Sequence, residues 1–343
     1  MANPSQKVVN ATQSYLASKL VEGALDGNIG MSLFLARAKA GMWRGAQEEV
    51  PFKFEKNVNG GSFSGADTLS TAMVDNTIKL TFDCKFNEIP TVLAKTDLSL
   101  NKTEMERADL MERQIASDAV DLADTIGNQF YQDGSGNGGK DILGLAGIVD
   151  DGTTLATIGG QARATYPALN ATVTATGGTL TLAQMYTAWD AASEGNQEPD
   201  FILTTKSIRS LYNQLLDPKQ RYDLVGELKG KDAMFAGVKQ LMFRSAPVIG
   251  DSKCPSGLMY FLNSDSFEFR YLDKYEGATA AKFSLEELDG EPSGKEATSL
   301  GFHWTGWTQS TNQEVLVGRA VHAGNFVVKN PRYNAVLTGI TGI

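Results

Sequence analysis

The sequence has few of the residues on which metal binding, disulfide formation and most hydrolytic chemistry depend. Its 343 residues include two cysteines, Cys84 and Cys254, and two histidines, His303 and His322. Two cysteines exclude a disulfide-rich scaffold and favour a reducing compartment. Neither histidine belongs to an HExxH motif or lies near a cysteine pair. We therefore expect no catalytic residue, no metal and no cofactor.

Long apolar runs and basic stretches are also missing. No run reaches the ~18 apolar residues that a membrane span needs, and the N-terminus lacks the basic start and apolar core of a signal peptide. A formal net charge of -9 and a pI near 4.9 argue against a reader of nucleic acid, which would carry a basic face. An acidic protein can still face nucleic acid without binding it tightly. We expect a protein that is made in the cytosol and has no membrane partner.

A glycine-rich stretch imitates a phosphate-binding loop. Gly134, Gly136 and Gly139 match G-x-G-x-x-G, and residues 134–140 match the start of a Walker A motif. Such loops follow a strand and open a helix, so that backbone N–H groups meet the phosphate. Here the loop follows a predicted helix, and Asp141 replaces the Ser or Thr that would bind magnesium. The pattern therefore indicates a turn.

The most regular feature is a predicted helix over residues 103–132. Apolar residues recur in it at steps of three and four, including Met111, Ile115, Leu122 and Ile126. Thr103 and Glu106 form a capping-box pattern, and Asp133-Gly134 favours a stop. A helix of this length spans roughly 40 Å, which suits a spine across a flat molecule.

An extended hairpin is predicted before this helix. Residues 77–86 alternate apolar and polar side chains, and we expect them to pair with residues 50–58, with Pro90 ending regular pairing. An isolated two-stranded hairpin is marginal in water, so we expect it to lie on something else.

The middle and the end of the chain complete an α+β pattern. Helices are predicted over residues 180–193 and 206–216, with a buried strand at 200–204 between them. Further strands are predicted at 247–249, 258–262 and 267–271, and then at 303–307, 313–321 and 325–329.

An arm, a long hairpin and a long helix expose more surface than one chain can bury. This favours a protein that packs against copies of itself.

The order of these parts resembles the major capsid proteins of tailed bacteriophages with the HK97-type fold. Local stretches that also look like the family are ILGLAGI after the long helix, DFILTTKSIRSLYNQL, PVIGDSKCPSGLMYFLNSDSFEFRYL and the later AGNFVVKNPRYNAV. The resemblance implies five parts: an N-terminal arm (1–57), an extended loop or E-loop (58–96), a P domain (97–179) with spine helix 103–132, an α/β A domain (180–300), and C-terminal strands (301–343) that return to the P domain.

The resemblance also implies a function. The chain would form hexamers and pentamers of an icosahedral head shell around packaged double-stranded DNA, without sequence-specific binding. It would be a virion protein, assembled in the cytoplasm of a bacterial host, with a portal protein and a separate scaffolding protein as partners. We expect no fused scaffold, because the spine helix starts near residue 103, and no covalent cross-link between subunits. Candidate inter-subunit contacts are Phe63, Lys79, Phe82, Lys85, Arg107 and Arg113.

Three alternatives stay open. One is a surface or tail structural protein of a phage, which electron microscopy of assemblies would separate from a shell. An encapsulin-like nanocompartment shell has the same fold and encloses enzymes in place of DNA. A cytosolic α+β enzyme would need a pocket that holds His303 or His322 beside a carboxylate.

Overall fold

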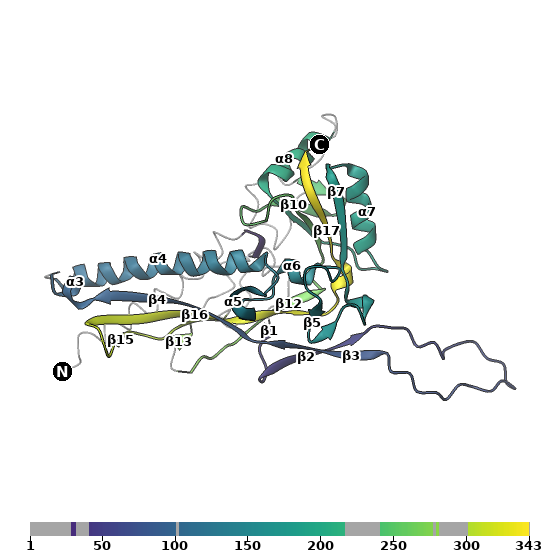
Figure 1. The fold of residues 1–343 in the computed structure, drawn as a ribbon, viewed down its shortest axis with the longest axis horizontal. Coiled ribbons are helices and arrows are strands. Elements are labelled where there is room, and N and C mark those ends of the chain that lie inside the picture. Colours follow the sequence, from purple (N-terminus) through teal and green to yellow (C-terminus); the bar gives the residue numbers. More distant parts are fainter. Residues whose placement is uncertain are drawn as a thin grey trace, which may run out of the picture.

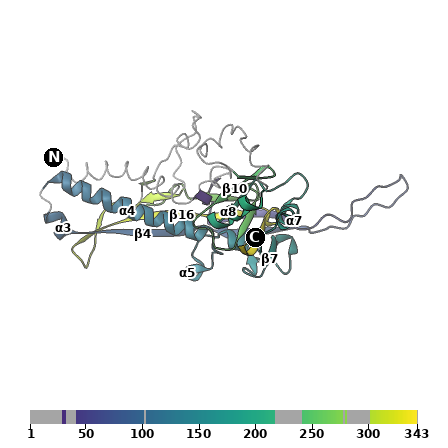
Figure 2. The ribbon, with the colours of Figure 1, turned by 90° about the horizontal axis from the view of Figure 1, so that it is seen from above.

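The computed structural model describes residues 29–31, 41–100, 103–216, 241–276, 279–280 and 301–342. They form an elongated body with a long helix along one side, a second unit standing upright at one end, and a hairpin that projects beyond it (Figure 1). Figure 2, seen from above, shows the hairpin and the start of the long helix at opposite ends of the molecule. The mixed α+β architecture is the predicted one.

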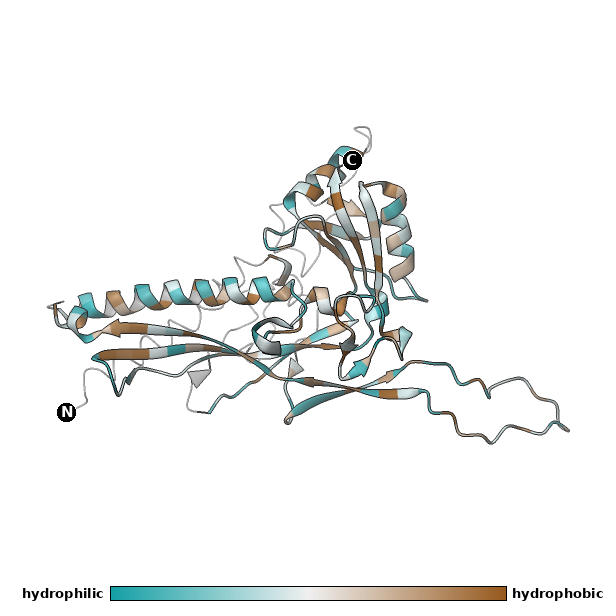
Figure 3. Ribbon diagram, viewed as in Figure 1, coloured by the Kyte–Doolittle hydropathy of each residue, from teal (hydrophilic) through white to brown (hydrophobic). Residues whose placement is uncertain are grey.

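The long helix, α4, spans Glu104–Phe130, as the capping residues predict. Thr103 accepts a hydrogen bond from the Glu106 backbone, and the Glu106 side chain accepts one from the Thr103 backbone. Its apolar stripe, which includes Ile115, Leu122 and Ile126, is buried, and α4 packs on β4 (Lys85–Ala94). Figure 3 shows the alternation of hydrophilic and hydrophobic residues along the helix.

Beneath α4 lies a seven-stranded sheet whose centre is β16 (Val315–Val328). β4 pairs antiparallel with β16 from Lys85↔Gly324 to Ala94↔Val315. The remaining strands are β12 (Phe267–Tyr271), β14 (Phe302–Trp304), β13 (Thr279–Ala280), β15 (Thr308–Gln309) and β1 (Gly41–Met42).

Pro90 does not end strand pairing, contrary to the prediction. It lies inside β4 and faces Arg319 of β16. Among the described strands, β16 is the partner of β4 and no strand lies on the other side of β4. Proline has no backbone N–H, and its absence is tolerated where that position faces the unpaired side of a strand. The predicted strand over 77–86 is correspondingly divided, into β3 (Thr77–Asp83) and the start of β4.

The upright unit is built on a six-stranded sheet in the order β7-β17-β11-β8-β10-β9. Its strands are β7 (Thr172–Thr179), β8 (Phe201–Thr204), β9 (Leu241–Phe243), β10 (Ala246–Gly250), β11 (Met259–Leu262) and β17 (Ala335–Gly342). Helices α7 (Leu182–Ala192) and α8 (Lys206–Leu215) pack on it.

Alternation along these strands divides the interior into two cores. On β8 and β11, Ile202, Met259 and Phe261 join the core under α7 and α8, which also holds Trp189. Their neighbours Leu203 and Tyr260 point to the other face and join the core of the seven-stranded sheet and α4. Both faces of this sheet are therefore covered, which explains why its strands are almost continuously apolar.

The predicted domain boundaries need three corrections. β7 was expected in the spine-helix domain and β17 with the other C-terminal strands, but both lie in the six-stranded sheet, paired with each other. β12 was expected in the A domain but pairs with β16 in the seven-stranded sheet. The chain crosses between the sheets at these points, and strand partners that are distant in sequence decide the sheet to which a strand belongs.

Short elements complete the fold: α3 (Lys95–Leu100) links β4 to α4, and the others lie in the segments that run between the two sheets. These others are α5 (Gly136–Gly139), α6 (Leu145–Ile148), β5 (Thr157–Ile158), β6 (Gln161–Ala162), and the 3₁₀ turns η1 (Pro167–Leu169) and η4 (Pro331–Tyr333).

Candidate functional site: the extended hairpin and its root

The projecting hairpin is formed by β2 (Gln47–Lys53) and β3 (Thr77–Asp83), paired antiparallel from Gln47↔Asp83 to Lys53↔Thr77. The expected boundary at 57/58 therefore divides the hairpin, and its first strand begins ten residues earlier than residue 57. Residues 54–76 connect the two strands and extend beyond the body at the right of Figure 1.

This connecting loop carries apolar side chains that its own chain does not cover. Every residue from 55 to 73 is exposed. Phe63 is 67% exposed and Met73 is fully exposed, and Val58 and Leu69 are also exposed large hydrophobic residues. Four large apolar side chains are thus exposed on this one loop. The loop has the properties of a surface that is buried in an assembly.

The end of the hairpin nearest the body, which we call the root, is attached by two sets of contacts. On the β3 side, the Thr81 backbone N–H donates to the Gly159 carbonyl at 3.0 Å, and the Gln161 side chain donates to the Lys79 carbonyl at 3.1 Å. On the β2 side, the preceding strand β1 pairs parallel with β12, and the Trp43 N–H donates to the Tyr271 carbonyl at 2.7 Å. The β2 side also carries a chain of charges.

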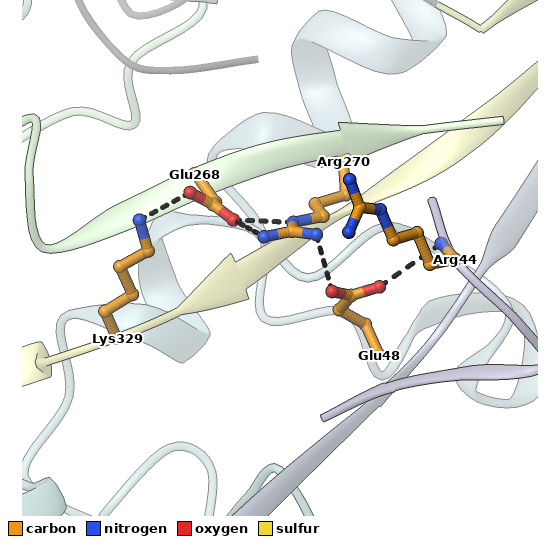
Figure 4. Close-up of polar contacts among 5 residues, drawn as sticks. All are labelled: Arg44, Glu48, Glu268, Arg270 and Lys329. Carbon is orange, nitrogen blue, oxygen red and sulfur yellow. Dashed lines mark hydrogen bonds and ion pairs between the residues drawn. The ribbon is translucent and has the colours of Figure 1, made fainter. Parts of the chain in front are cut away.

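Four charged side chains form this chain, which we call the root network (Figure 4). Lys329 Nζ lies 2.5 Å from one oxygen of Glu268, and Arg270 contacts the other oxygen. Arg270 Nη1 reaches Glu48 Oε1 at 2.5 Å, and the second oxygen of Glu48 accepts a hydrogen bond from the Arg44 backbone. Lys329 directly follows β16, so the network joins the end of β16 and β12 to β2 and ties the hairpin to the seven-stranded sheet.

The charges of this network are partly removed from water. The Glu268 side chain is 7% exposed. Burial raises the pKa of the Glu268 carboxyl, but hydrogen bonds and charge from Lys329 and Arg270 outweigh it, so the pKa lies below its ordinary value. Glu268 is therefore a carboxylate at neutral pH, with a cation on each side of it.

The six predicted contact residues do not form one cluster. Phe63 is exposed in the hairpin loop. Lys79 lies on β3 in an exposed ion pair with Glu49. Lys85 donates to the Gly139 carbonyl at 2.6 Å, within its own chain. Arg107 and Arg113 lie on the exposed face of α4.

Among these six residues, Phe82 is the one whose burial argues against a contact with another subunit. It is 5% exposed and belongs to the core of its own chain. The alternation of β3 was correctly read from the sequence, but the apolar face at the root packs on the body.

Sequence reasoning missed the root network and the buried carboxylate of Asp251. A signal was present in residues 267–271, because Glu268 and Arg270 share one face of a strand that otherwise contains aromatic residues. The partners Glu48 and Lys329 lie 220 and 61 positions away from Glu268, and no local pattern connects them.

Both histidines are buried. His303 is buried and its Nε2 contacts the Leu272 carbonyl at 2.9 Å, and burial lowers its pKa. His322 is buried between Phe269, on which it stacks, and Phe302. Within the described ranges no three His, Cys, Asp or Glu side chains are grouped to hold a metal ion.

The phosphate-loop pattern and the cysteines give no site either. Residues 136–139 form a short turn in which Asn137 and Gly138 are left-handed, so they do not open a regular helix. Burial raises the pKa of the Cys84 thiol to about 11 and that of Cys254 to about 12, which keeps both thiols protonated and unreactive. Among the described helices, none combines the length and hydrophobicity required to cross a bilayer.

Comparison with known proteins shows the fold. Neither protein-family models nor curated sequences gave a match. Among solved structures, the capsid asymmetric unit of cyanophage A-1(L) has a TM-score of 0.65 and 19% identity, over 91% of this chain and 93% of that chain. The capsid of a native GTA particle has a TM-score of 0.58 and 10% identity, over 89% and 88%.

A third similar structure is the holo-SrpI encapsulin complex from Synechococcus elongatus, with a TM-score of 0.51 and 10% identity, over 90% of this chain and 87% of that chain. Together these likenesses define the class. The chain has the HK97-type fold of phage capsid and related shell proteins, as the order of its elements predicted.

Proposed function

We propose that the chain is the major capsid protein of a tailed bacteriophage, which assembles into the icosahedral head shell around double-stranded DNA. The observation that carries the proposal is the exposed apolar loop of residues 55–73 on a subunit whose fold matches capsid structures over about nine-tenths of its length. A loop of this kind is unfavourable in a lone subunit and is explained by burial against a neighbour.

The parts of the chain take the corresponding roles. The hairpin β2-β3 with its loop serves as the E-loop and lies on a neighbouring subunit. The seven-stranded sheet with α4 serves as the P domain, and the six-stranded sheet with α7 and α8 serves as the A domain, which meets its copies at the centre of a capsomer. The residues before β1 serve as the N-terminal arm. Phe63, Lys79, Lys85, Arg107 and Arg113 remain our candidate inter-subunit contacts.

Hexamers and pentamers of the chain build the shell, with a portal protein and a separate scaffolding protein as further partners. The protein acts as a structural component without catalysis. A net charge of -9 suits a shell that holds DNA without binding it tightly or by sequence. The mature protein is located in the virion, after assembly in the bacterial cytoplasm.

The experiment is expression of the chain followed by negative-stain electron microscopy and sedimentation. We expect closed shells or capsomers with five-fold and six-fold symmetry. A protein that stays monomeric at high concentration would contradict the proposal and would favour the enzyme alternative. An intact mass that shows loss of a large N-terminal piece during maturation would contradict a separate scaffold.

The likeness to the encapsulin complex supports a second candidate, a nanocompartment shell. The phage proposal has the better structural support, since the cyanophage capsid has the higher TM-score and identity. The contents of native particles separate the two functions: packaged double-stranded DNA favours the phage capsid, and enclosed protein favours the nanocompartment.

A further inference from the structure

Another buried carboxylate, that of Asp251, lies where three distant segments of the chain meet. Asp251 directly follows β10 and is 1% exposed. Its backbone N–H donates to the Thr204 carbonyl at 2.7 Å, which continues the pairing of β10 with β8. Its Oδ1 accepts the Lys253 backbone N–H at 2.9 Å. Its Oδ2 accepts two further hydrogen bonds, which come from outside the six-stranded sheet.

One of these donors belongs to the long helix and the other to the N-terminal region. The Tyr131 hydroxyl donates at 2.7 Å, and the Gly30 backbone N–H donates at 2.8 Å. Tyr131 is the C-cap residue of α4. Burial and the neighbouring Asp251 hold the pKa of Tyr131 well above its ordinary value, so its hydroxyl keeps the proton that it donates.

The site is shaped for glycine at position 30. A Cβ atom there would lie 2.6 Å from Asp251 Oδ2, still closer to the Tyr131 hydroxyl, and 3.3 Å from Leu203 Cδ1. Two of these atoms are the hydrogen-bonding groups themselves, and all three belong to buried residues, so they cannot all move away. The next residue, Met31, is buried in the same core as Leu203 and Tyr131. The site therefore fits a glycine that donates its backbone N–H, followed by a residue with a long apolar side chain, as in Gly30–Met31.

The loop that carries Asp251 is also tied to α4 at a second point. Lys253 forms an ion pair with Asp124, about two turns before the end of the helix. Two interactions thus connect the loop after β10 to the last part of α4: the hydrogen bond from the Tyr131 hydroxyl to Asp251 and the ion pair between Lys253 and Asp124. The Gly30 N–H donates to the same Asp251 oxygen as the Tyr131 hydroxyl. The Asp251 carboxylate therefore contacts both the N-terminal segment and the end of α4.

We propose that Asp251, Tyr131 and Leu203 form a binding socket for the Gly30–Met31 step of the N-terminal segment, and that its occupancy holds the six-stranded unit against the end of α4. When Gly30 leaves, Asp251 Oδ2 loses one of its two donors inside an apolar core, and the loop over 251–254 loosens from α4. The Gly30–Met31 step then acts as a clamp on the subunit.

Hydrogen–deuterium exchange of the full-length protein tests this socket. Gly30→Ala and Asp251→Asn are the test variants, and Gly61→Ala and Asp265→Asn are the controls. Gly61 has open space around its Cβ position and ordinary φ, and Asp265 is exposed. We expect the amide of residue 30 to be protected in the natural protein and in both controls. In the test variants its exchange rises by about tenfold or more, together with exchange over 128–131 and 251–254.

Protection of the β16 amides reports that each variant is folded, and Tyr131→Phe replaces Asp251→Asn if that variant unfolds. Unchanged exchange at residue 30 in the folded test variants would overturn the socket. Faster exchange at residue 30 alone, with 128–131 and 251–254 unchanged, would overturn the clamp. Neither readout depends on shell formation, so the outcome is independent of the proposed function.

Discussion

Arg163 shows how a single residue stabilises the connection between the two sheet units. It is 1% exposed, and its guanidinium donates to the backbone carbonyls of Asp150 at 2.7 Å, Leu169 at 2.6 Å and Gly147 at 2.5 Å. Burial lowers the pKa of this group, while the charge of Asp150 opposes the shift. The side chain replaces the strand partners that this irregular part of the chain lacks.

Replacement of this arginine removes all of these hydrogen bonds at once. Arg163→Met leaves buried carbonyl groups without partners, each of which costs about 1–3 kcal/mol. We expect the free energy of unfolding of the unassembled protein to fall by about 3 kcal/mol or more, measured by urea denaturation. Arg319→Met removes an exposed ion pair with Glu88 and serves as the control, with an expected loss of about 1 kcal/mol or less. Equal losses in the two variants would contradict the role of Arg163.

The root network predicts that the contribution of Glu268 to the free energy of unfolding depends on pH. The pKa of Glu268 is lowered in the folded protein from its ordinary value of 4.5. A lowered carboxyl pKa contributes stability that is fully present above the ordinary pKa and is lost as the pH falls through the folded pKa. Glu268→Gln removes this contribution. We expect the difference in unfolding free energy between the natural protein and Glu268→Gln to be largest near neutral pH.

The measurement is urea unfolding of both proteins from about pH 7 down to about pH 3. The difference between them should stay constant down to about pH 4.5 and then shrink. A difference that grows as the pH falls would have the wrong sign and would contradict the assigned direction of the pKa shift.

At the scale of the element, α4 has one face that must stay apolar. Ile115 is buried against the seven-stranded sheet unit, whereas Val120 on the same helix is exposed. Ile115→Asp places an unpaired charge in the core, at a cost of several kcal/mol, and we expect no folded protein and no particles. Val120→Asp places the same charge in water, and we expect folding as in the natural chain, read by circular dichroism and particle yield. Normal yield from Ile115→Asp would contradict the assigned face.

The success of sequence reasoning also differs among elements. α4 and α7 were predictable because their signals are local: an apolar period and a capping box at Thr103 and Thr181. The alternation of β3 gave its buried face for the same reason. Pro90 was misread because the sequence does not show that β4 pairs with β16 on one side and that no other described strand lies on its second side.

Long-range pairing accounts for the remaining differences. β17 joins β7 across a separation of more than 150 residues, and nothing within Ala335–Gly342 identifies that partner. The root network and the Asp251 socket are likewise assembled from segments that lie about 220 residues apart. Their residues look like ordinary charged or small residues until the fold brings them together.

At the scale of the whole molecule, the hairpin loop is the part whose apolar side chains a single subunit leaves exposed. The body buries two cores and both faces of its six-stranded sheet, but residues 55–73 have no cover from the described part of their own chain. The root network fixes the direction in which this loop projects. The subunit thus has a folded body and an oriented, exposed apolar extension, which is a geometry for association between copies.

Sedimentation velocity of a loop variant tests this association most directly. In the double variant Phe63→Ser, Met73→Ser, two exposed apolar side chains are removed from the loop, and the control Thr71→Ser changes an exposed polar residue in the same loop. We expect the natural protein and the control to sediment as shells or capsomers. The double variant should remain a small species with an unchanged unfolding midpoint. Shells formed by the double variant in natural yield, or a natural protein that sediments as a monomer, would contradict the account.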